Sequence, residues 1–155
     1  MRDFLLLNYA RVWPVGLSPV APGTCSSLVA IVLAPFIFMP LPMWGRVLVL
    51  LFVLVTGAIA SSRAEQILGK KDPSEAVIDE IFGQWLTILP FAFLLWWEYV
   101  AAFVLFRIFD ILKPWPIKRL EEIEGGLGVM IDDGAAALYA MLCLHLVRAL
   151  PFYGG

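Results

Sequence analysis

Residues 81–109 have the sequence IFGQWLTILPFAFLLWWEYVAAFVLFRIF, a long apolar stretch with one acidic residue, Glu98, near its centre. A straight helix of this length would measure about 43 Å, well beyond the ~30 Å hydrocarbon core of a bilayer. Two short helices in a hairpin, or a re-entrant pair, fit better. We expect the turn at the aromatic residues 96–99 and a kink at Pro90. The path of this stretch decides whether its two flanking segments meet.

The distribution of basic residues favours the hairpin. A single crossing would place the basic segments 63–71 and 107–119 on opposite sides of a membrane, against the tendency of Lys and Arg to stay cytoplasmic. A hairpin places both segments on the cytoplasmic side together with the N-terminus. It leaves Arg46 and Arg148 on the outer side.

The composition indicates a membrane protein. Hydrophobic residues make up 61% of the chain and charged residues 15%, whereas soluble domains carry about 25% charged residues. The mean hydropathy is +0.88. A chain of 155 residues cannot bury so much apolar surface within its own fold, and its length indicates one domain over residues 1–155. The formal net charge of −2 makes nucleic acid an unexpected partner.

Three further apolar spans are expected, at residues 28–45, 47–62 and 134–150. Together with the hairpin they predict an all-α, polytopic bundle of about five apolar helices. Residues 1–13 are expected to form a short amphipathic helix that lies on the membrane surface.

The first acidic cluster, residues 70–83, follows the second span at 47–62. Its pair Asp72-Pro73 predicts a helix start, with Asp72 as the N-cap and Pro73 in the first helical position. In such a helix Asp72, Glu75 and Asp79 share one face, and Glu80 lies beside it. The alternative for Asp72 is a capping role alone.

Two more charged clusters follow the hairpin. Arg107, Asp110 and Lys113 recur every three residues and share a helix face. Asp132 and Asp133 stand at the beginning of the last apolar span. The simpler interpretations are a surface ion pair between Arg107 and Asp110 and a helix cap from one aspartate of the pair.

The hairpin would bring these clusters together at one membrane face. Converging carboxylates repel one another unless a multivalent cation neutralises them, and all-oxygen ligation favours Mg²⁺. Arg107 and Lys113 would supply positive charge for phosphate oxygens. The pattern therefore predicts Mg²⁺-dependent phosphoryl chemistry at a membrane surface.

The segment SPVAPGTCSSL, residues 18–28, leads into the first span. Ser26 or Ser27 can cap the helix that follows, and the free N–H groups of a helix start favour anions. The alternative is a simple connecting loop.

Four blocks of this sequence resemble the phosphatidylglycerophosphatase A family. They are APGT at 21–24, DPSEAVIDEIFG at 72–83, FRIFDILKPWPI at 106–117 and GGLGVMIDD at 125–133. The resemblance implies an all-α protein of the bacterial inner membrane whose active site faces the cytoplasm. It also implies Mg²⁺ as cofactor and phosphatidylglycerophosphate as the lipid substrate, from which the terminal phosphate is hydrolysed.

The same resemblance assigns roles to residues. The catalytic residues it implies are Asp72, Asp79, Glu80, Asp132 and Asp133. The Mg²⁺ ligands it implies are Asp79, Glu80, Asp110, Asp132 and Asp133. The substrate-binding residues are Arg107, Lys113, Thr24 and Ser27. Attack by water and attack by an aspartate both remain open. The family usually has glycine where Ser26 stands, so a close approach of this backbone to phosphate also stays open.

A small membrane transporter for divalent cations or anions is the alternative from another class. Its acidic residues would be spread through the depth of the membrane, whereas here Glu98 alone lies away from the predicted cytoplasmic face. A structural metal in an assembly subunit would leave Arg107 and Lys113 without a role. The sequence does not determine the number of metal ions or the oligomeric state.

Overall fold

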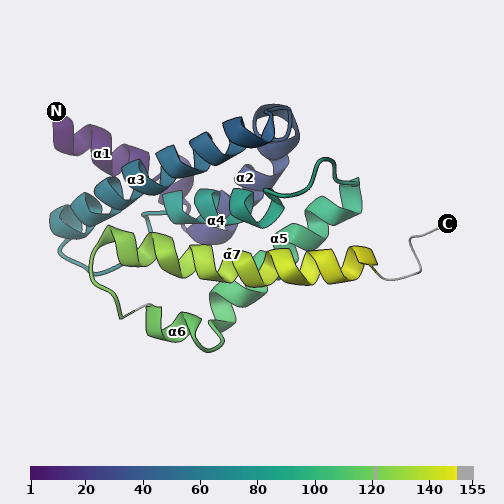
Figure 1. The fold of residues 1–155 in the computed structure, drawn as a ribbon. Coiled ribbons are helices and arrows are strands. Elements are labelled where there is room, and N and C mark those ends of the chain that lie inside the picture. Colours follow the sequence, from purple (N-terminus) through teal and green to yellow (C-terminus); the bar gives the residue numbers. More distant parts are fainter. Residues whose placement is uncertain (121, 150–155) are drawn as a thin grey trace.

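The computed structural model describes residues 1–120 and 122–149, and within these residues all regular structure is helical. The all-α prediction is therefore confirmed. The elements in chain order are α1 (Arg2–Ala10), the short 3₁₀ helix η1 (Val15–Leu17), α2 (Pro22–Ile37), α3 (Met43–Leu68), α4 (Ile78–Ile88), α5 (Trp96–Leu112), α6 (Ile117–Leu120) and α7 (Gly126–Ala149) (Figure 1). Helix α7 packs against α3, α4 and α5 and forms the centre of the bundle.

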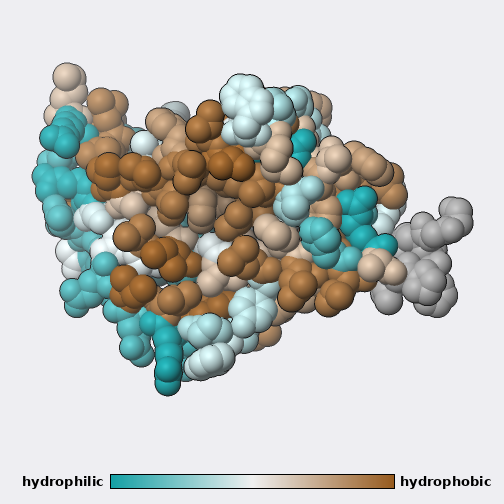
Figure 2. Space-filling model, in the orientation of Figure 1, coloured by the Kyte–Doolittle hydropathy of each residue, from teal (hydrophilic) through white to brown (hydrophobic). Residues whose placement is uncertain are grey.

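Two of the described helices, α3 with 26 residues and α7 with 24, are long and apolar enough to cross a membrane. Helix α2 is apolar but shorter, so the five apolar helices that we expected are not confirmed as spans. Figure 2 shows apolar side chains over the middle of one face, hydrophilic ones gathered at the end where α3 finishes and α7 begins, and a smaller hydrophilic group toward the other end. This division suits a bundle with its ends in water and its middle in lipid.

The stretch 81–109 does form two helices, α4 and α5, but the turn lies earlier than expected. Residues 89–95 connect the helices, so Pro90 stands in the connection and does not kink an arm. The predicted turn at 96–99 is instead the first turn of α5. The reason is Glu98, whose carboxylate accepts the Leu95 N–H at 2.6 Å and so satisfies a free donor at the helix start. Glu98 is buried and pairs with Arg148 at 3.0 Å.

Arg46 binds two connections between helices, residues 38–42 after α2 and residues 89–95 after α4. We expected it between two spans, but it lies in the first turns of α3 and is 6% exposed. Its guanidinium donates to the carbonyl oxygens of Met39 at 2.6 Å, Leu41 at 3.0 Å and Phe91 at 2.6 Å. These carbonyls follow α2 and α4, and the charge of Arg46 is compensated by backbone groups that would otherwise lack donors.

Replacing Arg46 by methionine is expected to lower the free energy of unfolding by about 3 kcal/mol, because several buried carbonyls lose a charged donor. Reversible unfolding in detergent measures the change. Lys70→Met is the control, since Lys70 is exposed, and it should stay within about 0.5 kcal/mol of the wild type. Equal stability of the two variants would rule out this role for Arg46.

Candidate active site

A cavity of about 310 Å³ opens where the start of α2, the start of α4, the end of α5 and the first half of α7 meet. Of the site residues expected from the sequence, all but Ser27 line this cavity. Those that line it are Thr24, Asp72, Asp79, Glu80, Arg107, Asp110, Lys113, Asp132 and Asp133. Residues separated by up to 109 positions, from Thr24 to Asp133, therefore share one cavity. The predicted meeting of the acidic clusters is observed.

Helix α4 begins at Ile78, five residues later than the first helical position that the Asp72-Pro73 signal predicted. Asp72 has a left-handed φ of 44° and does not cap α4. The expectation that Asp72, Glu75 and Asp79 share a helix face is therefore wrong, although Asp72 still reaches the cavity. The first turn of α4 now consists of Ile78, Asp79 and Glu80, which places both acids at the helix N-terminus, where negative charge is favourable.

Hydrogen bonds from distant segments explain the late start of α4. The N–H of Val77 donates to the Ala10 carbonyl at 2.8 Å, and the Val77 carbonyl accepts the Ser26 hydroxyl at 2.8 Å. Glu75 forms an ion pair with Arg11. The segment before α4 is thus bound to α2 and to the residues around the end of α1. No local pattern in the sequence predicts these contacts, because their partners are more than 50 residues apart.

Asp79, Glu80 and Asp133 form a group that fits a cation. One oxygen from each lies within 4.8 Å of the others. Among the described residues, Asp79 Oδ1, Glu80 Oε2 and Asp133 Oδ2 are buried and meet no hydrogen-bond donor. Buried carboxylate oxygens without donors are costly, and three neighbouring carboxylates that each carry one suit a hard divalent cation such as Mg²⁺.

The pKa values of the two α4 acids show how strongly this group needs positive charge. Burial, with a smaller contribution from the negative charge of Asp133, raises the pKa of Glu80 to about 8. Burial and the neighbouring Glu80 raise the pKa of Asp79 well above its ordinary value. Both residues precede the predicted membrane hairpin. Without a cation, the site therefore retains protons near neutral pH.

In the absence of divalent cations, stability is expected to fall as the pH rises. Between the ordinary pKa of 4.5 and the folded value of about 8 for Glu80, the folded state holds a proton that the unfolded state has released. The free energy of unfolding therefore decreases with pH across this window, and the loss is complete above it. With EDTA, the midpoint of thermal unfolding should fall by about 5 °C between pH 5 and pH 8. Added Mg²⁺ should reverse the fall, and Glu80→Gln should make it smaller, since Asp79 keeps a pKa that burial raises. A fall of the same size in Glu80→Gln and in the wild type would contradict the shifted pKa of Glu80.

The two basic residues of the cavity are each held by an aspartate. Arg107 Nη1 lies 2.5 Å from Asp110 Oδ2 and 3.9 Å from Glu80 Oε1. Lys113 Nζ lies 2.5 Å from Asp132 Oδ2. These pairs are largely buried, so Arg107 and Asp110 are not the surface ion pair of the simpler interpretation. Asp110 holds the guanidinium group of Arg107 at the cavity wall, and Asp132 holds the ammonium group of Lys113 there.

Asp132 and Asp133 lie inside α7, which begins at Gly126. The interpretation of either one as the cap of the last helix is therefore wrong. Both side chains are buried, at 4% exposure. Asp133 faces Asp79 and Glu80, while Asp132 faces Lys113.

The start of α2 supplies the remaining wall. This helix begins at Pro22, so Ser26 and Ser27 lie within it and the expected serine cap is wrong. The Ser27 hydroxyl donates to the Gly23 carbonyl at 3.0 Å and lies 3.5 Å from Arg107 Nη1. Ser27 therefore touches a cavity residue without lining the cavity. The backbone N–H groups at Gly23 and Thr24 are in the first turn, where a helix favours anions.

Gly23 permits the closest approach in the site. A Cβ atom at Gly23 would lie 2.1 Å from Glu80 Oε1 and 3.5 Å from Arg107 Nη1. The backbone of α2 thus rests against the carboxylate of Glu80. Ser26 is buried, and its hydroxyl is directed at the Val77 carbonyl oxygen.

The chain is similar to known proteins over most of its length. The family model described as phosphatidylglycerophosphatase A matches residues 9–148. A protein of Escherichia coli named phosphatidylglycerophosphatase A is 35% identical over 85% of this chain and 77% of its own. One of Haemophilus influenzae with the same name is 35% identical over 96% and 94%. A protein of Bacteroides thetaiotaomicron, provisionally named a phosphatidylinositol-3-phosphatase, is 36% identical over 86% and 87%. No solved structure matches the chain.

Proposed function

The chain belongs to the phosphatidylglycerophosphatase A family of phosphatases, and from this premise we propose that it hydrolyses the terminal phosphomonoester of phosphatidylglycerophosphate in an Mg²⁺-dependent reaction. The products are phosphatidylglycerol and phosphate. The observation that carries the proposal is the cavity itself. It places three carboxylates, each with a buried oxygen that meets no donor, in one cavity with the side chains of Arg107 and Lys113.

Each part of the cavity has a task in this reaction. Arg107 and Lys113 bind the oxygens of the phosphate, and the N–H groups at the start of α2 bind the same charge. Asp110 and Asp132 keep the two cations in position. Asp79, Glu80 and Asp133 hold Mg²⁺, which when bound supplies positive charge against the phosphoryl group. Asp72 lines this cavity and also an adjoining one, which Lys71 and Lys118 line as well. Its carboxylate adds negative charge at the edge of the site.

The nucleophile is water or one of the aspartates. Water attacks phosphorus, the bond to the glycerol oxygen breaks, and that oxygen takes a proton as it leaves. In the other route an aspartate first takes the phosphoryl group, and water releases it from the acyl phosphate. Rapid acid quenching of a single turnover with ³²P-labelled lipid separates the two routes, because only the second leaves label on the protein.

We also propose that the cavity faces the cytoplasm of a bacterial inner membrane. In a variant without Cys25 and Cys143, cysteines at Ser74 and Glu122 should react with a membrane-impermeant reagent from the same side. A cysteine at Met43, at the other end of α3, should react from the opposite side. Labelling of positions 74 and 122 from opposite sides would contradict the hairpin topology.

The test of substrate is phosphate release by the purified protein in mixed micelles. Phosphatidylglycerophosphate should be hydrolysed with Mg²⁺ and not with EDTA. Phosphatidic acid and phosphatidylinositol 3-phosphate are the comparison substrates, the second because one relative bears that name. Faster phosphate release from either comparison lipid than from phosphatidylglycerophosphate would contradict the proposed substrate. No release from any of them, together with ion flux in proteoliposomes, would favour the transporter.

A further inference from the structure

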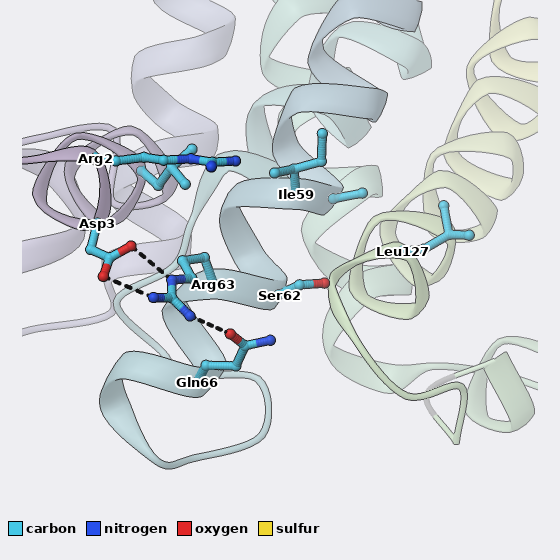
Figure 3. Close-up of a pocket in the computed structure, with 9 residues that line it drawn as sticks. Arg2, Asp3, Ile59, Ser62, Arg63, Gln66 and Leu127 are labelled. Carbon is cyan, nitrogen blue, oxygen red and sulfur yellow. Dashed lines mark hydrogen bonds and ion pairs between the residues drawn. The ribbon is translucent and has the colours of Figure 1, made fainter.

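A second cavity, of about 540 Å³, lies between α1, α3 and the first turn of α7 (Figure 3). It shares no lining residue with the candidate active-site cavity, which contains Asp79, Glu80 and Asp133. Its lining combines polar residues, among them Arg2, Ser62 and Arg63, with apolar residues, among them Leu6, Ile59 and Leu127. The mixture of walls suits a ligand that is itself amphipathic.

The polar lining includes one positive charge, that of Arg2, which no ion pair among the described residues compensates. Arg63 donates to both carboxylate oxygens of Asp3, at 2.9 and 2.8 Å, and to Gln66 Oε1 at 2.6 Å. This bidentate pair neutralises Asp3. Arg2 makes no ion pair with any residue in the part of the chain that the structure describes. Figure 3 shows its side chain extending from α1 toward Ile59.

The wall formed by α3 and the start of α7 is fixed by close helix packing. A Cβ atom at Gly126 would lie 2.1 Å from the Ala58 carbonyl oxygen, so α7 begins in direct contact with α3. The N–H of Gly126 donates to Ser62 Oγ at 2.8 Å. Ser62 accepts that bond with its oxygen, which leaves its hydroxyl proton for an acceptor in the cavity. The cavity is therefore preformed and contains two donors.

An apolar ridge continues from the cavity along α3. Ile59, Val55 and Leu51 recur every four residues on one face of this candidate span, and they are 52%, 58% and 52% exposed. A headgroup in the cavity would therefore place its acyl chain along a helix face that is already apolar.

We propose that this cavity binds the headgroup of an anionic phospholipid. Arg2 contacts the phosphodiester, Ser62 donates to a neighbouring oxygen, and an acyl chain lies along Ile59, Val55 and Leu51. The bound lipid joins α1 to α3 and α7. This inference does not depend on the proposed catalytic activity, because it rests on other residues and is tested without turnover.

The test is the lipid-dependent shift of the thermal unfolding midpoint in neutral detergent, since a ligand that binds only the folded protein raises this midpoint. The proteins are the wild type, Arg2→Gln, Leu127→Trp and the control Arg119→Gln. Leu127→Trp keeps every charge and fills the cavity, while Arg119 is an exposed arginine at the same end of the bundle. The additives are phosphatidylglycerol, phosphatidylcholine and soluble glycerol 3-phosphate.

Phosphatidylglycerol should raise the midpoint of the wild type and of Arg119→Gln more than phosphatidylcholine does. In Arg2→Gln and Leu127→Trp, the extra shift should fall below half of the wild-type value. Glycerol 3-phosphate should have little effect, because it lacks the acyl chain. Equal shifts in all four proteins, or a shift from glycerol 3-phosphate as large as that from the lipid, would overturn the proposal.

Discussion

Replacing Asp79 by asparagine is expected to lower the rate of phosphate release from phosphatidylglycerophosphate by roughly 10³-fold, because the site loses about 4 kcal/mol of transition-state stabilisation. Asp79 is 6% exposed and its Oδ1 is buried without a hydrogen-bond donor, and one of its carboxylate oxygens lies within 4.8 Å of oxygens of Glu80 and Asp133. Asparagine keeps the shape and removes the charge. The residual rate should depend little on Mg²⁺.

Glu124→Gln is the matched control for this change, since it removes one carboxylate charge from an exposed position at the same end of the protein. Its rate should stay within about threefold of the wild type, as for most surface substitutions. Circular dichroism of both variants checks that they remain folded. An Asp79→Asn protein as active as the control would remove Asp79 from the site.

Alanine at Gly23 is expected to lower activity about 100-fold while leaving the fold intact. The added Cβ would lie 2.1 Å from Glu80 Oε1, so the carboxylate must move away from the start of α2. The carboxylate is the end of a flexible side chain, and its displacement costs little stability. A catalytic group displaced by about 1 Å can nevertheless cost on the order of 100-fold in rate.

Gly45→Ala provides the comparison for the glycine change. A Cβ at Gly45 meets its nearest atom, in Pro42, at 3.4 Å, which is ordinary contact, and the residue is also in the first turn of a helix. Both variants should unfold within about 3 °C of the wild type, and only Gly23→Ala should be slow. Similar rates for the two would show that Glu80 does not need its observed position.

Much of this arrangement could be predicted because its signals are local. Apolar length indicated two helices, expected at 28–45 and 47–62, and they are present with shifted bounds, at Pro22–Ile37 and Met43–Leu68. The excess length of 81–109 required a break. The clustering of acids around Asp79 and Asp133 indicated a shared site, since like charges that converge need a partner. The structure brings these residues together, as expected.

The starts of α4 and α2 differ in how far the sequence predicts them. The start of α4 depends on bonds from Val77 to Ala10 and from Ser26 to Val77, which no local pattern contains. The start of α2 did carry a local signal, because Pro22 occupies its first helical position, as proline often does.

Helix α7 shows how glycine can mislead. The glycines at 125–128 resemble a loop, yet the helix begins at Gly126. A Cβ at Gly128 would lie 2.2 Å from the Ile123 carbonyl, and Gly126 rests on α3. These glycines serve close packing, which a single sequence cannot separate from flexibility. Asp132 and Asp133 therefore lie within a helix and reach the cavity from its side.

The central claim is that Asp79, Glu80 and Asp133 form one divalent cation site from two distant parts of the chain. Electron paramagnetic resonance of Mn²⁺, titrated into the metal-free protein in detergent, measures binding without turnover. Wild type and Glu124→Gln should show saturable binding that Mg²⁺ displaces, and Asp133→Asn should bind at least about tenfold more weakly. Binding by Asp133→Asn as tight as that of the wild type would contradict the account.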